Sequence, residues 1–174
     1  MSQHDYTIKK ALLIVLGLDA FLLFCLLLIA LLLEGDAMER LVFTLFFLPT
    51  LLLFLECYFR RVTVAKAGMA IRKLGRTKAF PWGEITRVGC LTVRRKVYLL
   101  LTTVKGLFII SNAFEGFSKL VEEIVARVEP ERVEEDVRPQ AASAKAGIAT
   151  IFPAWVAAVF MMVMILMKWF PFIA

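Results

Sequence analysis

The sequence has few of the residues that commonly carry catalysis, bind metals or form phosphate-binding loops: one histidine, three cysteines and nine glycines in 174 residues. It contains no Gly-rich phosphate loop, nucleophile elbow, HExxH motif or paired-carboxylate motif. Cys25, Cys57 and Cys90 are odd in number and widely spaced, which gives neither a disulfide framework nor zinc-ligand spacing. We therefore expect a protein that is not an enzyme and has no metal site and no cofactor.

Long hydrophobic runs are abundant instead. Hydrophobic residues make up 60% of the chain, above the roughly 45–50% of soluble domains. Residues 11–33 and 148–167 are long and apolar enough to cross a bilayer core of about 30 Å. A third window, residues 41–55, is short if counted strictly, but Glu56 can snorkel and residues 57–59 extend its apolar character to the interface. The first window exceeds the apolar run of a signal peptide and no small-residue cleavage site follows it, so we expect a retained helix. The sequence thus predicts a transmembrane helical hairpin over residues 11–59, and a third transmembrane helix with a short outer tail over residues 148–174.

The positive charges indicate how these helices are oriented. Seventeen of the 21 Lys and Arg residues lie between Cys57 and Gly147, and Lys9 and Lys10 precede the first window. Loops on the cytoplasmic side of a membrane are enriched in Lys and Arg. We therefore expect a multi-pass protein whose N-terminus (residues 1–10) and central segment are cytoplasmic and whose C-terminal tail is outside.

The central segment, residues 60–128, has the pattern of a small α+β domain. Short runs rich in Val, Ile, Leu and Thr alternate with Gly or basic turns, which predicts a meander of five to seven strands. The clearest runs are residues 60–64, 69–74, 85–93, 97–104 and 107–111. Ser111 or Asn112 is the expected cap of an amphipathic helix whose apolar residues recur up to Val128. The predicted fold class is an α+β membrane protein in which this helix covers an open side of the sheet or barrel.

Three stretches of this domain resemble the bacterial pleckstrin-homology-like (PH-like) domains of small membrane proteins. They are Phe80-Pro-Trp-Gly-Glu-Ile85, the hairpin of residues 97–104 and 107–111, and Asn112-Ala-Phe-Glu-Gly-Phe117, which opens the last helix. The resemblance covers about residues 58–128. It implies a cytoplasmic PH-like β-meander or barrel with a C-terminal helix, and a location in the bacterial inner membrane.

The domain carries an excess of positive charge that points to an anionic partner. Fourteen basic residues stand against four acidic ones between Cys57 and Val128. In a meander the turns alternate between two ends, so two basic turns fall at the end nearest the membrane, where an anionic leaflet attracts each cation by about 1 kcal/mol. The residues predicted to contact lipid are Arg72, Lys73, Arg76, Lys78, Arg94, Arg95 and Lys96.

The basic turns are also compatible with a role unrelated to lipid. Cytoplasmic loops are basic for reasons of topology alone. A bend within one strand at Pro81–Gly83, in place of a turn, moves the second basic turn to the far end of the domain. No RNP-like or helix-turn-helix pattern accompanies the charge, so nucleic acid is not an expected partner.

Asp19 is the one ionisable residue well inside a predicted span. Counting equal depths on both sides of the hairpin turn places Asp19 level with Glu56, near the cytoplasmic interface, with Arg60 and Arg61 about one helical turn further on. Ionisable groups in hydrocarbon are costly and either pair or serve a function. We expect these four residues to form a structural clamp; the alternative is a proton or ion relay.

Residues 129–147 are rich in Pro, Ala and acidic residues, which predicts a linker whose acids can reach the basic face of the domain.

Two functions fit the sequence. The first is a non-enzymatic, membrane-anchored PH-like module that contacts anionic lipid headgroups or a cytoplasmic protein partner at the inner leaflet. The second is an accessory or structural subunit of a larger membrane complex, or of a homo-oligomer, assembled through its transmembrane helices.

Overall fold

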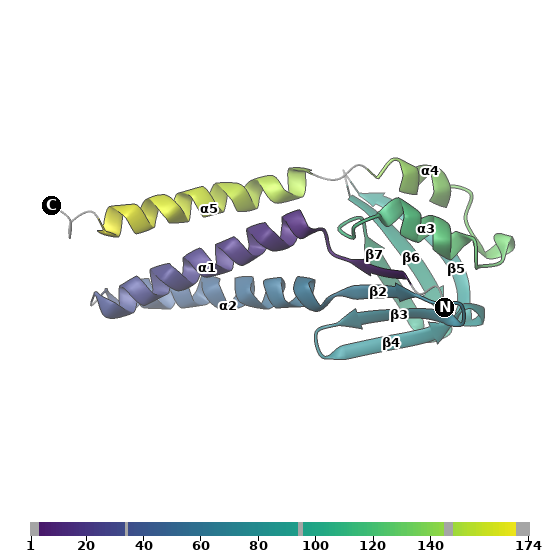
Figure 1. The fold of residues 1–174 in the computed structure, drawn as a ribbon, viewed down its shortest axis with the longest axis horizontal. Helices are drawn as coiled ribbons and strands as arrows, with labels where there is room; N and C mark the ends of the chain where they lie inside the picture. Colours follow the sequence, from purple (N-terminus) through teal and green to yellow (C-terminus); the bar gives the residue numbers. More distant parts are fainter. Residues whose placement is uncertain (1–3, 34, 94–95, 145–147, 170–174) are drawn as a thin grey trace. The chain divides into compact units, whose positions relative to one another are not determined.

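The computed structural model describes residues 4–33, 35–93, 96–144 and 148–169. The chain forms two compact units. One unit, called the β-domain below, comprises residues 1–9 and 59–147 and holds the strands (Figure 1). The other, called the helical unit, comprises residues 10–58 and 148–174 and holds the long helices. The α+β class predicted from the sequence is confirmed.

The β-domain consists of two antiparallel sheets, with the orders β1-β2-β3-β4 and β5-β6-β7 (Figure 1). The strands are β1 (His4–Thr7), β2 (Arg61–Val64), β3 (Gly68–Lys73), β4 (Arg76–Pro81), β5 (Ile85–Val93), β6 (Lys96–Thr103) and β7 (Gly106–Ser111). A 3-10 turn, η1 (Trp82–Glu84), follows β4 and leads the chain from the first sheet into the second. Residues Pro81–Gly83 are therefore not a bend within one strand.

Each sheet buries one of its two faces. Successive side chains of a strand point to opposite faces, so alternate residues share an environment. The buried apolar positions of the strands are Val62, Val64, Met69, Ile71, Phe80, Ile85, Val88, Val97, Leu99, Leu101 and Ile110. These residues form the core of the β-domain between the two sheets.

The N-terminal segment is part of the first sheet and not a free extension. β1 pairs with β2 along its whole length, from His4 opposite Val64 to Thr7 opposite Arg61. Beyond β1, Ile8 is buried and forms a bridge with Phe114. The segment expected to lie outside the domain therefore joins the first sheet to the chain that follows β7.

The last helix of the predicted α+β domain begins later than the sequence indicates. α3 (Phe117–Val125) starts after Gly116, which has a left-handed backbone with φ of 65°, so the predicted cap at Ser111 or Asn112 is wrong. The intervening chain pairs with the N-terminal segment: the amide of Glu115 donates to the carbonyl of Thr7. The expected amphipathic face is present, since Phe117, Leu120, Val121, Ile124 and Val125 are buried.

The segment expected to be a linker packs on the β-domain as far as residue 144. It contains a 3-10 turn, η2 (Pro130–Arg132), and a short helix, α4 (Val137–Ala142). Val133 forms a parallel bridge with Val88 on β5. Val137 and Ala141 are buried, and their spacing of four residues places them on one side of the helical turn. The apolar residues at intervals of four thus cover one edge of the second sheet.

The helical unit contains three helices that are long and apolar enough to cross a membrane. They are α1 (Lys10–Leu32), α2 (Ala37–Phe59) and α5 (Ile148–Trp169). Their bounds differ from the predicted windows by only a few residues. Three membrane-spanning helices were expected, and helices of the required length and composition are confirmed.

Packing within the helical unit brings the start of α2 and the end of α5 to the same end of the unit. Leu26, Ala30, Phe43 and Ala158 belong to one buried cluster. Close to it, Lys168 Nζ lies 2.5 Å from Glu39 Oε1 and 5.8 Å from the ring centroid of Phe43. This ion pair joins the first turn of α2 to the end of α5, and the tail that follows α5 was predicted to lie on the outer side.

The pairing of β1 with β2 predicts on which side of the membrane the two ends of the α1–α2 hairpin lie relative to one another. These strands flank the α1–α2 hairpin in sequence but share one sheet, so the residues before α1 and after α2 must lie on the same side of the membrane. With the three native cysteines replaced by serine, Asp5→Cys and Thr77→Cys are expected to react with an impermeant maleimide from the same side of sealed vesicles. Met38→Cys, in the first turn of α2, is expected to react from the other side; opposite sidedness of positions 5 and 77 would contradict the pairing.

Ile8 gives a stability test of the same strand. Its side chain is 2% exposed, and truncation of such a residue commonly costs about 2–5 kcal/mol. Ile8→Ala is therefore expected to lower the free energy of unfolding of the β-domain by about that amount, as measured by denaturant unfolding of the full chain in detergent. Thr77→Ala, at an exposed position of β4, is the control and is expected to change it by under about 0.5 kcal/mol. Equal effects of the two variants would mean that the N-terminal segment does not stabilise the domain.

Candidate functional site

The hairpin of β3 and β4 has an inner face that changes from apolar to cationic along its length. Its six inner positions form three cross-strand pairs: Met69 with Phe80, Ile71 with Lys78, and Lys73 with Arg76. The first pair is buried in the core. The last pair lies beside the turn, where Gly75 adopts a φ of 67° that favours glycine. Cations thus occupy positions where the alternation of the sheet otherwise places core residues.

A cleft of about 400 Å³ opens between this hairpin and β7. Its lining residues are Arg60, Ile71, Lys73, Arg76, Lys78, Tyr98, Leu107, Phe108, Ile109 and Ser111. Four of them are cations, and none of these described lining residues is acidic. We call this site the cationic cleft.

The cleft-lining ring of Phe108 is packed against the core. Phe80 and Phe108 stack with their ring centroids 4.8 Å apart, and so connect the β3–β4 hairpin to β7. Lys78 Nζ lies 5.4 Å from the centroid of the Phe108 ring. Such a cation–π contact contributes about 0.5–2 kcal/mol and leaves the ammonium protons free to meet an anion. The ring therefore positions Lys78 without neutralising it.

Arg60 is held in the wall of the cleft by two contacts. Its Nη2 donates to the carbonyl of Ile109 at 3.2 Å, and its guanidinium carbon lies 5.7 Å from the ring centroid of Phe114. Its Nε is buried and has no hydrogen-bond partner within the described residues. A buried donor without an acceptor costs about 1–3 kcal/mol. A ligand oxygen in the cleft is one way to satisfy it.

Carboxylates do not neutralise the cations of the cleft in the part of the chain that the structure describes. The ion pairs of the β-domain there involve His4, Arg87, Lys105, Arg127 and Arg132 instead. Several like charges that converge without counter-ions raise the local positive potential and attract anions. Phosphate oxygens are suited to such a site because they accept charge-assisted hydrogen bonds from several donors at once.

The predicted lipid-contacting residues divide between two faces of the first sheet. Lys73, Arg76 and Lys78 line the cleft. Arg72 is exposed on the outer face, opposite Arg61 and Thr77. The alternation of the strand therefore separates Arg72 from its neighbour Lys73.

Of the second predicted basic turn, Lys96 is the residue that the structure describes. Lys96 opens β6 two residues before Tyr98, which lines the cleft, so both side chains project from one face of the strand. Arg94 and Arg95 lie outside the described residues. Lys96 is thus the member of that turn whose position is known.

Of the four residues of the expected clamp, Asp19 and Glu56 belong to the helical unit and Arg60 and Arg61 to the β-domain, so the clamp stays a prediction. Asp19 is 6% exposed and its Oδ1 has no hydrogen-bond partner there. Glu56 is exposed on α2, and no described hydrogen bond or ion pair joins it to Asp19. Arg60 belongs to the wall of the cleft, and Arg61 is exposed on the outer face of β2.

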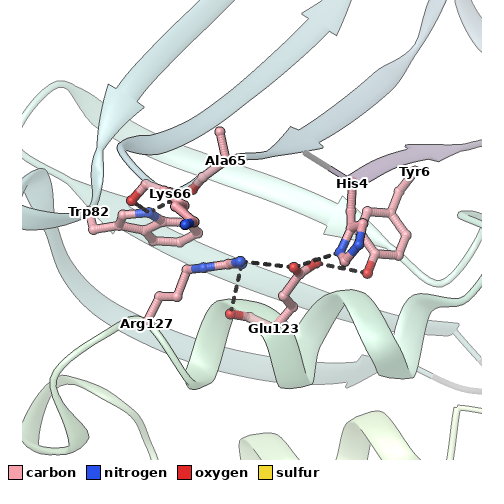
Figure 2. A network of polar contacts seen from close by, with 7 residues as sticks. All are labelled: His4, Tyr6, Ala65, Lys66, Trp82, Glu123 and Arg127. Carbon is pink, nitrogen blue, oxygen red and sulfur yellow. Dashed lines mark hydrogen bonds and ion pairs between the residues drawn. The ribbon is translucent and has the colours of Figure 1, made fainter. Parts of the chain in front are cut away.

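A second group of polar residues fastens the N-terminal strand to α3 (Figure 2). Glu123 on α3 accepts hydrogen bonds from His4 Nδ1 at 2.8 Å and from the Tyr6 hydroxyl at 2.9 Å. It also pairs with Arg127 Nη2 at 3.0 Å. The guanidinium of Arg127 lies 5.5 Å from the ring centroid of Trp82, whose Nε1 donates to the carbonyls of the β2–β3 turn. We call these residues the Glu123 network.

Titration of two members follows from their surroundings. Burial and the hydrogen bond to Glu123 raise the pKa of Tyr6 to about 12. Burial acts to raise the pKa of Glu123 as well, but the donors His4, Tyr6 and Arg127 outweigh it and hold the pKa below its ordinary value of 4.5. The network is therefore built around an ionised Glu123.

Sequence reasoning missed Arg60 as a cleft residue and missed the whole Glu123 network. The alternation Met69, Ile71, Lys73 followed by Arg76, Lys78, Phe80 is a signal for the cleft that the sequence contains. His4 and Tyr6 share one side of β1 by the same alternation. Their partner lies more than a hundred residues away, at Glu123, and no local pattern indicates it.

Comparison with known proteins assigns no family to the chain: no protein-family model, curated protein or solved structure matches it. Among the residues that the structure describes, no group of three or more His, Cys, Asp or Glu side chains is placed to hold a metal ion. The function is therefore argued from the chemistry of the cationic cleft.

The Glu123 network predicts a loss of stability in acid. Because the pKa of Glu123 is lower in the folded state, its contribution is present above about pH 4.5 and is lost as the pH falls through the folded pKa. Glu123→Gln is expected to flatten this part of the dependence, followed as hydrogen exchange of β1 and α3 in the full chain. Glu122→Gln, at the exposed neighbouring position, is the control; an acid dependence unchanged by Glu123→Gln would show that the network does not hold β1.

Proposed function

We propose that the chain is a non-enzymatic, membrane-anchored module of the bacterial PH-like kind, whose cationic cleft binds the phosphate of an anionic lipid headgroup. The observation that carries the proposal is the lining of the cleft: four cations and the hydroxyl groups of Tyr98 and Ser111, with no acidic residue among the described lining. These groups are donors that suit phosphate oxygens.

Chain connectivity supports a lipid as the source of that phosphate. Arg60, in the wall of the cleft, directly follows Phe59, the last residue of α2. Consecutive Cα atoms are about 3.8 Å apart, and α2 is long and apolar enough to cross a membrane. A residue that immediately follows a membrane-crossing helix lies at the level of the headgroups. The guanidinium of Arg60 is thus in position to meet a lipid phosphate.

The distribution of charge supports the cytoplasmic leaflet as the location, and the resemblance to bacterial PH-like domains implies the bacterial inner membrane. Seventeen of the 21 Lys and Arg residues lie between Cys57 and Gly147, and positive loops favour the cytoplasmic side. Anionic lipids of that leaflet attract each nearby cation by about 1 kcal/mol. The β-domain then faces the surface for which its charge is suited.

The strands and the final amphipathic helix support the PH-like assignment. Two antiparallel sheets followed by α3 agree with the meander and C-terminal helix that the sequence resemblance implies. The stretch Phe80–Ile85, part of that resemblance, forms the passage between the sheets, and Phe80 stacks on Phe108, which lines the cleft.

The cleft predicts a charge-reversal effect that depends on position. Lys73→Glu/Lys78→Glu removes two cations of the cleft and is expected to weaken binding of an anionic lipid by at least about 2 kcal/mol, roughly thirty-fold in affinity. The measurement is calorimetric titration of the full chain in a neutral detergent with dihexanoyl-phosphatidylglycerol, at two salt concentrations. Dihexanoyl-phosphatidylcholine is the zwitterionic comparison and is expected to bind weakly.

The matched control is Arg61→Glu/Arg72→Glu. These two cations are cross-strand partners on the outer face of the same sheet, so the variant has the same net charge but an intact cleft. It is expected to keep most of the affinity for the anionic lipid. An equal loss of affinity in both double variants would show that net charge alone causes the effect. Unchanged affinity in both would show that the cleft is not the binding site.

The second candidate function, an accessory subunit assembled through the transmembrane helices, is favoured by Asp19. A carboxylate in a membrane helix is costly, and such residues commonly serve function. The Oδ1 of Asp19 is buried without a hydrogen-bond partner in the described chain. If the cleft variants leave lipid binding unchanged, this candidate becomes the better one.

A further inference from the structure

The two sheets of the β-domain differ in what their outer faces carry. Antiparallel sheets with one solvated face usually place polar side chains outward. The first sheet follows this rule, with the outer rows Asp5, Thr63, Ala70, Ala79 and Thr7, Arg61, Arg72, Thr77. The outer positions of the second sheet instead include Leu91, Val93, Tyr98, Leu100, Leu107 and Ile109. We call these six residues the outer apolar face.

The outer apolar face is exposed and continuous. Leu107 is 57% exposed, and Leu91, Val93 and Ile109 are about half exposed. Across the strands, Ile109 lies opposite Leu100, and Leu91 lies opposite Tyr98. Single exposed apolar residues are ordinary, but a contiguous group marks a surface that meets a membrane or a partner.

The charges around this face favour an anionic bilayer as its occupant. Lys96 projects from the same face, opposite Val93. Arg87 lies at the other end of β5, where it neutralises Glu134 at 2.7 Å. None of the described strand residues on this face is acidic. The Glu134 carboxylate that lies over Gly89 of this face is neutralised by Arg87. Apolar side chains bordered by the cation Lys96, with a tyrosine among them, suit the interfacial zone of an anionic leaflet.

The outer apolar face is also continuous with the cationic cleft. Leu107 and Ile109 belong to both. The carbonyl of Ile109 accepts a hydrogen bond from Arg60, the residue that follows α2. The arginine that contacts β7 therefore immediately follows, in sequence, a helix long enough to cross the membrane.

We infer that the outer apolar face rests in the interfacial layer of the lipid bilayer. Leu107 and Ile109 meet the glycerol and upper acyl region while the cleft receives the phosphate. The inference deepens the proposed function and rests on it, because the domain must lie on an anionic leaflet. It adds a second contact surface, apolar in chemistry, that the charge-based proposal does not require.

Spin labels test this placement in the full chain. In nanodiscs, with the three native cysteines replaced by serine, a label is attached to Leu107→Cys, to Leu91→Cys or to Ala79→Cys. Ala79 lies on the outer face of the first sheet and is the matched control. In discs that contain phosphatidylglycerol, the ratio of oxygen to nickel-complex accessibility is expected to be several-fold higher at positions 107 and 91 than at position 79.

The outcomes separate the inference from the proposed function. Water-like accessibility of the labels at positions 91 and 107 overturns the inference. The proposed function is tested separately: loss of lipid binding in the cleft variants supports it, and retained lipid binding in those variants overturns it. Dipolar broadening between labels at position 107 in discs holding two copies would assign the face to a second copy of the chain and also overturn the inference. The expected accessibility ratio in discs with a single copy supports the bilayer as the occupant.

Discussion

The pairing of β1 with β2 is the constraint on which the rest of the structure depends. Because strands on either side of the α1–α2 hairpin share one sheet, the hairpin is an insertion between neighbouring strands of the β-domain. One residue, Arg60, separates α2 from β2, and only Ile8 and Lys9 separate β1 from α1. Short connections of this kind limit how far the chain can travel between a strand and a helix end. Arg60, the residue between α2 and β2, also lines the cationic cleft.

The β3–β4 hairpin shows how a binding site is formed by extending a core pattern beyond the core. Its inner face begins with Met69 and Phe80, which stabilise the domain by burial, and ends with Lys73 and Arg76, which contribute no such burial. Unpaired cations at inner positions repel one another, so the native state gives up some stability there. Departures from the expected pattern of a sheet are a common sign of function. The outer apolar face is a departure of the opposite kind.

The parts predictable from sequence were those with a strong local signal. The three apolar helices were found to within a few residues because length and composition alone define them. β4 was not recognised as a strand, since Arg76 and Lys78 interrupt the apolar alternation, and β1 was missed because four residues with a distant partner carry no periodic signal. Three cations of the cleft were among the predicted residues. Arg72 was grouped with them because adjacent residues of a strand point to opposite faces, and the sequence alone does not show which face is which. Arg60 was assigned to a clamp, since its contact with Ile109 is non-local.

The same insertion sets an order of events during biosynthesis. Residues 4–7 leave the ribosome before the α1–α2 hairpin, but their partner strand is made only after both helices of that hairpin. β1 therefore waits unpaired while α1 and α2 enter the membrane, and α3, which holds His4 and Tyr6 through Glu123, is translated later still. The first strand of the β-domain is thus among the last of its elements to reach its final position. A bulky fusion placed before His4 is consequently expected to hinder the pairing of β1 with β2 more than the insertion of α1 and α2.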